Sequence, residues 1–466
     1  MVKRSYHRNF FHLKMATTLA TLLQNYPDGL DGQGWNVKVL SSNPELPWSL
    51  VRQNPQGLES PAGNLQPWDM EDLSSNPSLD WTLVADFPEG LNSPNTPINL
   101  GNNDIQKWDV YNLSNNPTID WVFIAQYPEG LNGDPWNMTG LSGNPTIDTN
   151  LLINNPKGLN GYSWDVDKLS GNPALPASLI RQYPEGLPVF DGEWNVYSLS
   201  ANTNLDFTLL IDYPDGLGPA GRKQAWDMNN LSSNPSLPWS FVLQNMSGIG
   251  GNRWNIYWLS RNPAIDWQYV RDNLQGFGDR PWNLLGLSMN TTLPPDLVSD
   301  NPQGINSKIW DVSALSSNPN LDSDLIRSYP GGLCGQYWDI IKLSNNPSID
   351  FNLLLEYPDG LSGNAWSMYY LSYNPSVNWT IVSQNLNGIP TSGQPLSWDL
   401  FAFSINPSLD FTLVENNPNG FDGQSWNVFG LSYNPVTPWQ FVVNNPQGLD
   451  YQQWDASGLS SKTYTS

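Results

Sequence analysis

The chain has 466 residues and a formal net charge of −23, from 20 Lys and Arg against 43 Asp and Glu. We expect so acidic a body to repel nucleic acid and anionic lipid and to suit a basic partner surface. The only histidines are His7 and His12, and Cys334 is the only cysteine, so the rest of the chain excludes Ser-His-Asp triads, His-ligated metal sites and a disulfide framework. No stretch approaches the length of a membrane span.

A 28-residue unit is repeated along almost the whole chain. Each copy begins with a tryptophan, and nine of the fourteen gaps between these tryptophans are 28 residues. A fixed period of this size indicates a repeat array, which grows by adding layers. We number each repeat from its tryptophan, which is position 0. The fifteen copies begin at Trp35, Trp68, Trp108, Trp136, Trp164, Trp194, Trp226, Trp254, Trp282, Trp310, Trp338, Trp366, Trp398, Trp426 and Trp454.

The N-terminal residues depart from the repeat. We interpret residues 1–15 as a basic tail, because Lys3, Arg4, Arg8 and Lys14 precede any acidic residue. Residues 16–34 are interpreted as a half-repeat that caps the array, with a mitochondrial-type presequence as the alternative. The apolar run in this region is short and rich in threonine, so no secretory signal peptide is recognised. The tail is a candidate electrostatic anchor.

The tandem repeats occupy residues 35–453, and each is expected to open with a short helix. Position 1 is Asp or Asn in every copy except Ser367, and these side chains cap helix N-termini. The tryptophan before the cap and the Leu at position 5, which is Phe403 in one copy, have the spacing of a hydrophobic staple. Asn at position 8 and Pro at position 9 end the helix. We interpret this Asn, and the Ser at position 6, as local backbone caps.

A second short helix follows in each repeat. Position 12 is Asp in eight copies, Pro in five and Asn378 in one, and apolar residues flank it at positions 11 and 16. Pro at position 20 ends this helix, and the Gly at position 22 of all fourteen complete copies supplies a turn with positive φ. A helix of about seven residues is unstable alone, so the layers must stack. The prediction is an all-α solenoid, right- or left-handed, of about 14.5 repeats with a core of tryptophan.

The remaining features concern the edges of the array. Insertions fall between position 23 and the next tryptophan, an edge that often binds partners in solenoids. Residues 454–466 are interpreted as a C-terminal half-repeat and polar tail. No catalytic, cofactor-binding or metal-binding residues are predicted, because no acidic pair stands out and no phosphate-binding loop or calcium loop occurs. We therefore expect a protein that is not an enzyme.

Candidate contact residues occur where the repeat leaves the residue type free, at positions 3, 4 and 7 of the first helix. Large aromatic side chains at these positions are typical of interface cores, although they could instead pack between layers or under the insertions. Their density favours the C-terminal third of the chain. The candidate protein-contact residues are Tyr111, Tyr197, Tyr257, Trp258, Tyr369, Tyr370, Tyr373, Phe401, Phe429 and Tyr433.

The motif Trp-Asp/Asn-x3-Leu-Ser-x-Asn-Pro-x-Ile/Leu-Asp-Trp, found from about Trp35 to Ser460, resembles tandem repeats of large DNA viruses that infect protists. The Pro-x-Gly-Leu segment departs from the commoner form. The resemblance implies a viral origin without a defined activity. Our leading hypothesis is a non-enzymatic scaffold, such as a virion structural or assembly protein that contacts capsid or other virion proteins. It would be located in the virion or the host cytoplasm. The alternatives are a soluble adaptor for a basic host protein, or glycan binding through exposed aromatic residues.

Overall fold

The computed structural model describes residue 23 and residues 35–60, 62–91 and 106–455. The predicted basic tail, nearly all of the N-terminal cap and most of residues 454–466 lie outside this part of the chain. The described residues form 28 short helices, which confirms the all-α repeat solenoid. They divide into two compact units: unit 1 has the described residues up to 236 and residues 249–252, and unit 2 has residues 237–248 and the described residues from 253.

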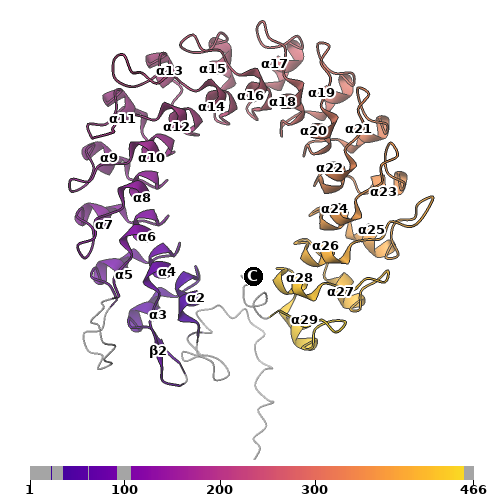
Figure 1. The fold of residues 1–466 in the computed structure, drawn as a ribbon, viewed down its shortest axis with the longest axis horizontal. Helices are drawn as coiled ribbons and strands as arrows, with labels where there is room; N and C mark the ends of the chain where they lie inside the picture. Colours follow the sequence, from indigo (N-terminus) through magenta and orange to yellow (C-terminus); the bar gives the residue numbers. More distant parts are fainter. Residues whose placement is uncertain (1–22, 24–34, 61, 92–105, 456–466) are drawn as a thin grey trace, which may run out of the picture. The chain divides into compact units, whose positions relative to one another are not determined.

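Unit 1 contains two rows of helices, one from each half of the repeat, and the first helices follow one another along the inner row in Figure 1. The first helices are α2 (Val37–Ser42), α4 (Met70–Ser75), α6 (Val110–Asn115), α8 (Met138–Gly143), α10 (Val166–Gly171), α12 (Val196–Ala201) and α14 (Met228–Ser233). The second helices are α3 (Trp48–Gln53), α5 (Trp81–Asp86), α7 (Trp121–Gln126), α9 (Thr149–Asn154), α11 (Ala177–Gln182) and α13 (Leu209–Asp212).

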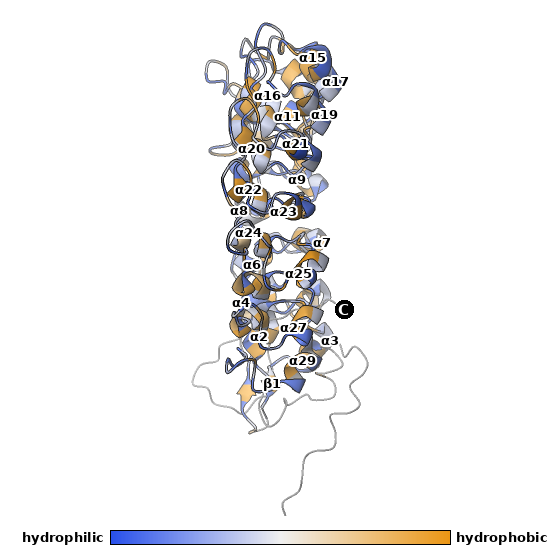
Figure 2. Cartoon of the chain, turned by 90° about the vertical axis from the view of Figure 1, so that its right-hand side faces the viewer, coloured by the Kyte–Doolittle hydropathy of each residue, from blue (hydrophilic) through white to orange (hydrophobic). Residues whose placement is uncertain are grey.

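Unit 2 repeats this arrangement, and Figure 2 shows its two rows side by side, with α22 and α24 in one row and α21, α23 and α25 in the other. The first helices are α16 (Ile256–Arg261), α18 (Leu284–Ser288), α20 (Val312–Ser316), α22 (Ile340–Asn345), α24 (Met368–Tyr373), α26 (Leu400–Ile405) and α28 (Val428–Tyr433). The second helices are α15 (Trp239–Gln244), α17 (Trp267–Asp272), α19 (Pro295–Asp300), α21 (Ser323–Ser328), α23 (Asn352–Glu356), α25 (Trp379–Gln384), α27 (Thr412–Asn416) and α29 (Trp439–Asn444).

The caps at position 1 start the first helices as predicted. In α22, for example, Asp339 has extended backbone and its carboxylate accepts a hydrogen bond from the amide of Lys342 at 3.2 Å. Only α24 among the described first helices lacks such a cap, because Ser367 makes no side-chain bond there. The helices have four to six residues, slightly fewer than expected. Each therefore depends on its neighbours for stability.

The second helices are capped in two ways. Asp or Asn at position 12 accepts from the first-turn amides, as Asp120 does from Val122 and Phe123 in α7. Where position 12 is Pro, as at Pro238, the helix begins without a side-chain cap. In α13, α23 and α27 the helix begins later than predicted, yet Asp350 still accepts from the amide of Asn352 at 3.0 Å. The Asp at position 12 therefore makes its capping hydrogen bond even where the helix is shorter.

The position-0 tryptophans form the core, as predicted. Thirteen of the fifteen are buried, with exposures of 0% to 4%. The N–H group of each of these buried indoles also has a hydrogen-bond acceptor. Trp338 donates from Nε1 to the carbonyl of Tyr329 at 2.8 Å, and Trp366 donates to the carbonyl of Tyr357 at 2.8 Å. These carbonyls close the second helix of the preceding repeat, so each buried position-0 tryptophan joins two layers.

The position-8 asparagines do more than the predicted local capping. Asn346 is 3% exposed, and its Oδ1 accepts from the amide of Ser348 at 2.9 Å within the same turn. Its Nδ2 donates to the carbonyls of Ser316 at 3.0 Å and Asn318 at 2.9 Å in the preceding layer. Asn374 repeats the pattern one layer on, so a continuous ladder of buried amides follows the first helices of unit 2. Unit 1 has an equivalent ladder, for example at Asn172.

The position-6 serines form a second ladder beside the first. Ser344 donates to the carbonyl of Ile340 at 2.7 Å in its own helix. The same oxygen accepts from the amide of Ser367 at 3.1 Å in the next layer. This serine is completely buried, and its hydroxyl positions the entry of the next first helix. The Ser and Asn of the motif are therefore interlayer residues as well as caps.

Most repeats end in a hairpin that was not predicted from the sequence. In one copy, Leu361 and Asn364 exchange backbone hydrogen bonds of 3.1 and 2.9 Å, with positive φ at Ser362 and Gly363 between them. The insertions lengthen this hairpin. In the first of them, strands β1 (Leu58–Glu59) and β2 (Leu65–Gln66) pair in antiparallel fashion.

Candidate protein-contact surface

All ten candidate contact residues lie on first helices, at the freely varying positions. The structure leaves seven of them exposed and three half-buried. The exposed residues are Tyr111, Tyr197, Tyr369, Tyr373, Phe401, Phe429 and Tyr433. The half-buried residues are Tyr257, Trp258 and Tyr370. Most of the candidates are therefore exposed rather than packed between layers.

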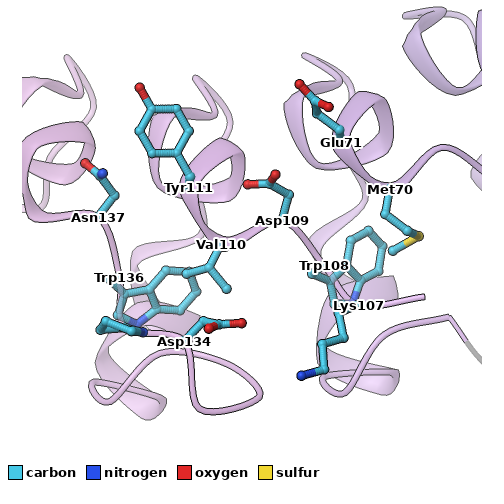
Figure 3. Close-up of a pocket in the computed structure, with 11 residues that line it drawn as sticks. Met70, Glu71, Lys107, Trp108, Asp109, Val110, Tyr111, Asp134, Trp136 and Asn137 are labelled. Atoms are coloured by element: carbon cyan, nitrogen blue, oxygen red, sulfur yellow. The ribbon is translucent and has the colours of Figure 1, made fainter. Parts of the chain in front are cut away.

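Position 3 points away from the core. Figure 3 shows Glu71 on α4 and Tyr111 on α6, which both occupy this position, directed away from the side where Trp108 and Trp136 lie. Tyr111 is 62% exposed, whereas Trp108 is 2% exposed. Trp108 precedes the extended N-cap Asp109, whereas Tyr111 lies in the first turn of α6, so the chain changes from the buried side to the solvent side where the helix begins. Every layer thus presents one position-3 side chain on the first-helix face.

The two units differ in the residues they place at position 3. In unit 1 most are polar or charged, and Tyr111 and Tyr197 are separated from each other by such residues. The unit 1 series is Lys38, Glu71, Tyr111, Thr139, Asp167, Tyr197 and Asn229. In unit 2 all but one are large and apolar. The unit 2 series is Tyr257, Leu285, Ser313, Ile341, Tyr369, Phe401 and Phe429.

Four consecutive first helices of unit 2, α22 to α28, therefore carry a continuous row of exposed apolar side chains. We call this row, with two tyrosines that contact it, the apolar stripe: Ile341, Tyr369, Tyr373, Phe401, Phe429 and Tyr433, which are 42% to 59% exposed. The tyrosines at position 7 contact the position-3 rings of their own helices. The rings of Tyr369 and Tyr373 are parallel at 6.5 Å, and those of Phe429 and Tyr433 are 4.9 Å apart.

Ile341 was not among the predicted contact residues, because the prediction considered aromatic side chains alone. This residue is 58% exposed, and Leu285, which has the same position in α18, is 42% exposed. Scoring position 3 for any large apolar side chain would have found both. The stripe ends at Ser313, whose hydroxyl accepts from Lys342 Nζ at 2.8 Å and donates to Asp339 at 3.0 Å.

Of the three half-buried candidates, Tyr370 lies on α24 with its ring 5.3 Å from that of Tyr369, and the other two lie at the other end of unit 2, on α16. The rings of Tyr257 and Trp258 are 4.9 Å apart, and the guanidinium of Arg261 lies 5.6 Å from the Trp258 ring centroid. The hydroxyl of Tyr257 also approaches the sulfur of Met289 in the next layer at 3.8 Å. These contacts within and between neighbouring helices stabilise the layers, so we place Tyr257 and Trp258 outside the stripe.

The segment that bears the stripe is acidic beyond α22, where Lys342 lies beside Ile341. Residues 343–455 contain nine Asp and Glu and no Lys, Arg or His. Two of these acids, Asp350 and Glu356, pair with Arg327 of the preceding layer on the second-helix row. At the stripe itself, partial burial raises the pKa of the Tyr433 phenol, and the charge and hydrogen bonding of Asp455 raise it further. A ligand of the stripe would therefore meet a negative field.

Unit 1 contains an open pocket of about 620 Å³ between α4, α6 and the start of α8. Figure 3 shows its mixed lining, with Glu71, Lys107 and Asp134 beside the Trp108 and Trp136 side chains. Asp109, which also lines it, is already used as the cap of α6 and accepts from the amide of Asn112 at 2.9 Å. The pocket gathers no set of free polar groups around one point.

The described residues contain no group of three or more His, Cys, Asp or Glu side chains placed to hold a metal ion. Among the same residues, no helix has both the length and the apolar character needed to span a membrane.

Together, the fold and the surface define a class: an all-α repeat solenoid whose layers carry variable side chains on one face of their first helices. Comparison of the chain with protein-family models and with curated proteins gives no match.

Proposed function

We propose that the chain is a non-enzymatic scaffold that binds another protein through the first-helix face of unit 2. The observation that carries the proposal is the apolar stripe, in which six large side chains on successive layers are 42% to 59% exposed. Aromatic side chains such as these dominate the energetics of protein interfaces. Contiguous exposed apolar surface on a protein is a common mark of an interaction site.

The stacked construction supports a scaffold. Most titratable groups with a defined partner serve caps or interlayer ion pairs, as Asp206 does when it accepts from Arg181 at 3.1 Å. Repeat arrays of this kind bind partners along an extended surface because each layer offers the same set of variable positions. The absence of histidine beyond residue 12 led us to expect no catalytic triad, and the proposal keeps that expectation.

Two more specific settings follow. The resemblance to viral tandem repeats supports a role as a structural or assembly protein of a large virus particle. The acidic segment 343–455 supports the second candidate, an adaptor that captures a basic protein. Glycan binding has weaker support, because thirteen position-0 tryptophans are buried and cannot act as stacking platforms.

A photoreactive benzoylphenylalanine at Phe401 tests the binding surface directly. The matched control carries the same group at Tyr197, a position-3 residue of unit 1 that is 62% exposed, against 50% for Phe401. We expect one dominant protein adduct from position 401, identified by mass spectrometry, and a much weaker one from position 197. Equal labelling at both positions, or no protein adduct at either, would contradict the proposal.

Quantitative mass spectrometry of purified virus particles, before and after a high-salt wash, tests the setting. High copy number that survives the wash indicates a packed structural component. Loss of the protein in the wash instead favours the adaptor, which relies on the acidic surface and is therefore sensitive to salt.

A further inference from the structure

We infer that the apolar stripe accepts an extended basic segment with aromatic side chains, and that residues 1–15 of this chain are such a segment. The inference rests on the proposed function, because it names the partner chemistry of the same surface. It is carried by three properties of unit 2: the spacing of the stripe, its apolar surface and the charge of the segment that bears it.

The spacing of the stripe suits an extended ligand. Packed helices are separated by about 8–10 Å, so the four layers from α22 to α28 extend over about 24–30 Å. An extended chain rises about 3.3 Å per residue, and three residues therefore advance it by about one layer. A helical ligand rises only about 1.5 Å per residue and would need about twenty residues for the same length. A segment with an apolar side chain every three or four residues therefore spaces these side chains about 10–13 Å apart, comparable with one layer.

Residues 1–15 have this pattern. Val2, Tyr6, Phe10 and Leu13 recur every three or four residues. Fifteen extended residues reach about 50 Å, which is more than the stripe requires. The aromatic rings of the stripe, at Tyr369, Phe401 and Phe429, would pack against these side chains.

The charges are complementary. The segment carries Lys3, Arg4, Arg8 and Lys14 and no acidic residue, whereas residues 343–455 carry nine acidic residues and no basic one. Asp399 caps α26 and Asp455 lies beside Tyr433, so negative charge flanks the row of rings. By contrast, the position-3 row of unit 1 includes Lys38 and is interrupted by polar side chains. Opposite charges of this kind make association faster and sensitive to salt.

A peptide of residues 1–15 with a fluorescent label, titrated with the full-length chain, tests the inference by anisotropy. The host is the quadruple variant K3E/R4E/R8E/K14E, in which the chain's own segment no longer competes. We expect this variant to bind the peptide at least tenfold more tightly than the wild-type chain does, and the affinity to fall at least tenfold between 50 and 300 mM salt.

The specificity of the surface is tested in the same host. The added substitutions F401S and F429S should weaken binding at least tenfold. Y197S, which removes an exposed tyrosine from unit 1, should leave the affinity unchanged. Because all three residues are exposed, circular dichroism should be the same for every variant. The inference is overturned if the quadruple variant does not bind the peptide, or if F401S/F429S and Y197S have equal effects.

Sedimentation measurements show whether the segment binds its own chain or a second copy of the chain. A monomeric wild-type chain at all concentrations indicates that the segment binds its own chain, and a dimer that the quadruple variant abolishes indicates that it binds a second copy. If the peptide does not bind, cross-linking at position 401 can still give a protein adduct. In that case the stripe binds another protein, and only the identity of the segment is wrong.

Discussion

The amide ladder makes a strong prediction about stability, because one buried side chain holds two layers together. Asn346→Ala removes the hydrogen bond from the Ser348 amide and the two that Nδ2 donates to Ser316 and Asn318. Since a buried neutral hydrogen bond contributes about 1 kcal/mol, the loss should be about 3 kcal/mol. The carbonyls left behind are shielded from water, so relaxation recovers little of this energy.

Hydrogen exchange measured by mass spectrometry is the suitable assay, because opening of a repeat array is local and a single unfolding free energy is poorly defined. A loss of about 3 kcal/mol should speed exchange of the α20 to α24 amides by about 100-fold. The matched control is Asn345→Ala, since Asn345 is the adjacent residue on α22 but is exposed. Its effect should stay within about 0.5 kcal/mol. Equal exchange in the two variants would refute the ladder as a source of stability.

Three further predictions concern other parts of the repeat. Trp338→Ala should cost about 3–5 kcal/mol, measured by hydrogen exchange of the α21 to α23 amides, because it removes a side chain that is 2% exposed, and Trp338→Phe should cost less while still losing the bond to the Tyr329 carbonyl. Gly360→Ala should destabilise more than Gly363→Ala in the same assay: both have positive φ, but a Cβ at Gly360 would lie 1.9 Å from the Asn364 carbonyl oxygen, whereas one at Gly363 meets nothing within 4 Å. Burial opposes ionisation of Asp350, but hydrogen bonds from Arg327 and the Asn352 amide outweigh it and hold the pKa of this carboxyl below its ordinary value. The pair is partly exposed, so Arg327→Ala should cost at most about 1 kcal/mol at pH 7. The stabilisation is present above the ordinary carboxyl pKa of about 3.9 and is lost as the pH falls through the lower folded value. An undiminished difference between wild type and variant at pH 2 would contradict the role of Asp350.

Much of the fold was predictable because one rule repeats along the chain. Asp or Asn before an apolar residue, followed by Leu and then Asn-Pro, fixes where each first helix begins and ends, and Asp339 and Asn346 behave accordingly. The tryptophans at position 0 were predicted to be buried because a regular stripe of large side chains is typical of a core. Trp338 confirms this at 2% exposure.

Other features required three-dimensional information. The second hydrogen-bonding role of Asn346 could not be inferred, since the carbonyls that it reaches belong to residues 28 and 30 positions earlier. The hairpin was different, because Asn132-Gly133 and Asp422-Gly423 are strong signals for a two-residue turn and could have been recognised. The candidate surface was predicted in part: its location in the C-terminal third and its aromatic members came from the sequence. The contribution of Ile341 depended on knowing that position 3 faces solvent in α22 and its neighbours α24, α26 and α28.

The measurement that tests the central claim most directly is the affinity of the partner identified by cross-linking at position 401. Purified partner is titrated by calorimetry against the wild-type chain, the F401S/F429S variant and the Y197S variant. The account predicts at least a tenfold loss of affinity for F401S/F429S and no change for Y197S. Equal affinities for all three proteins would show that the apolar stripe is not the binding surface.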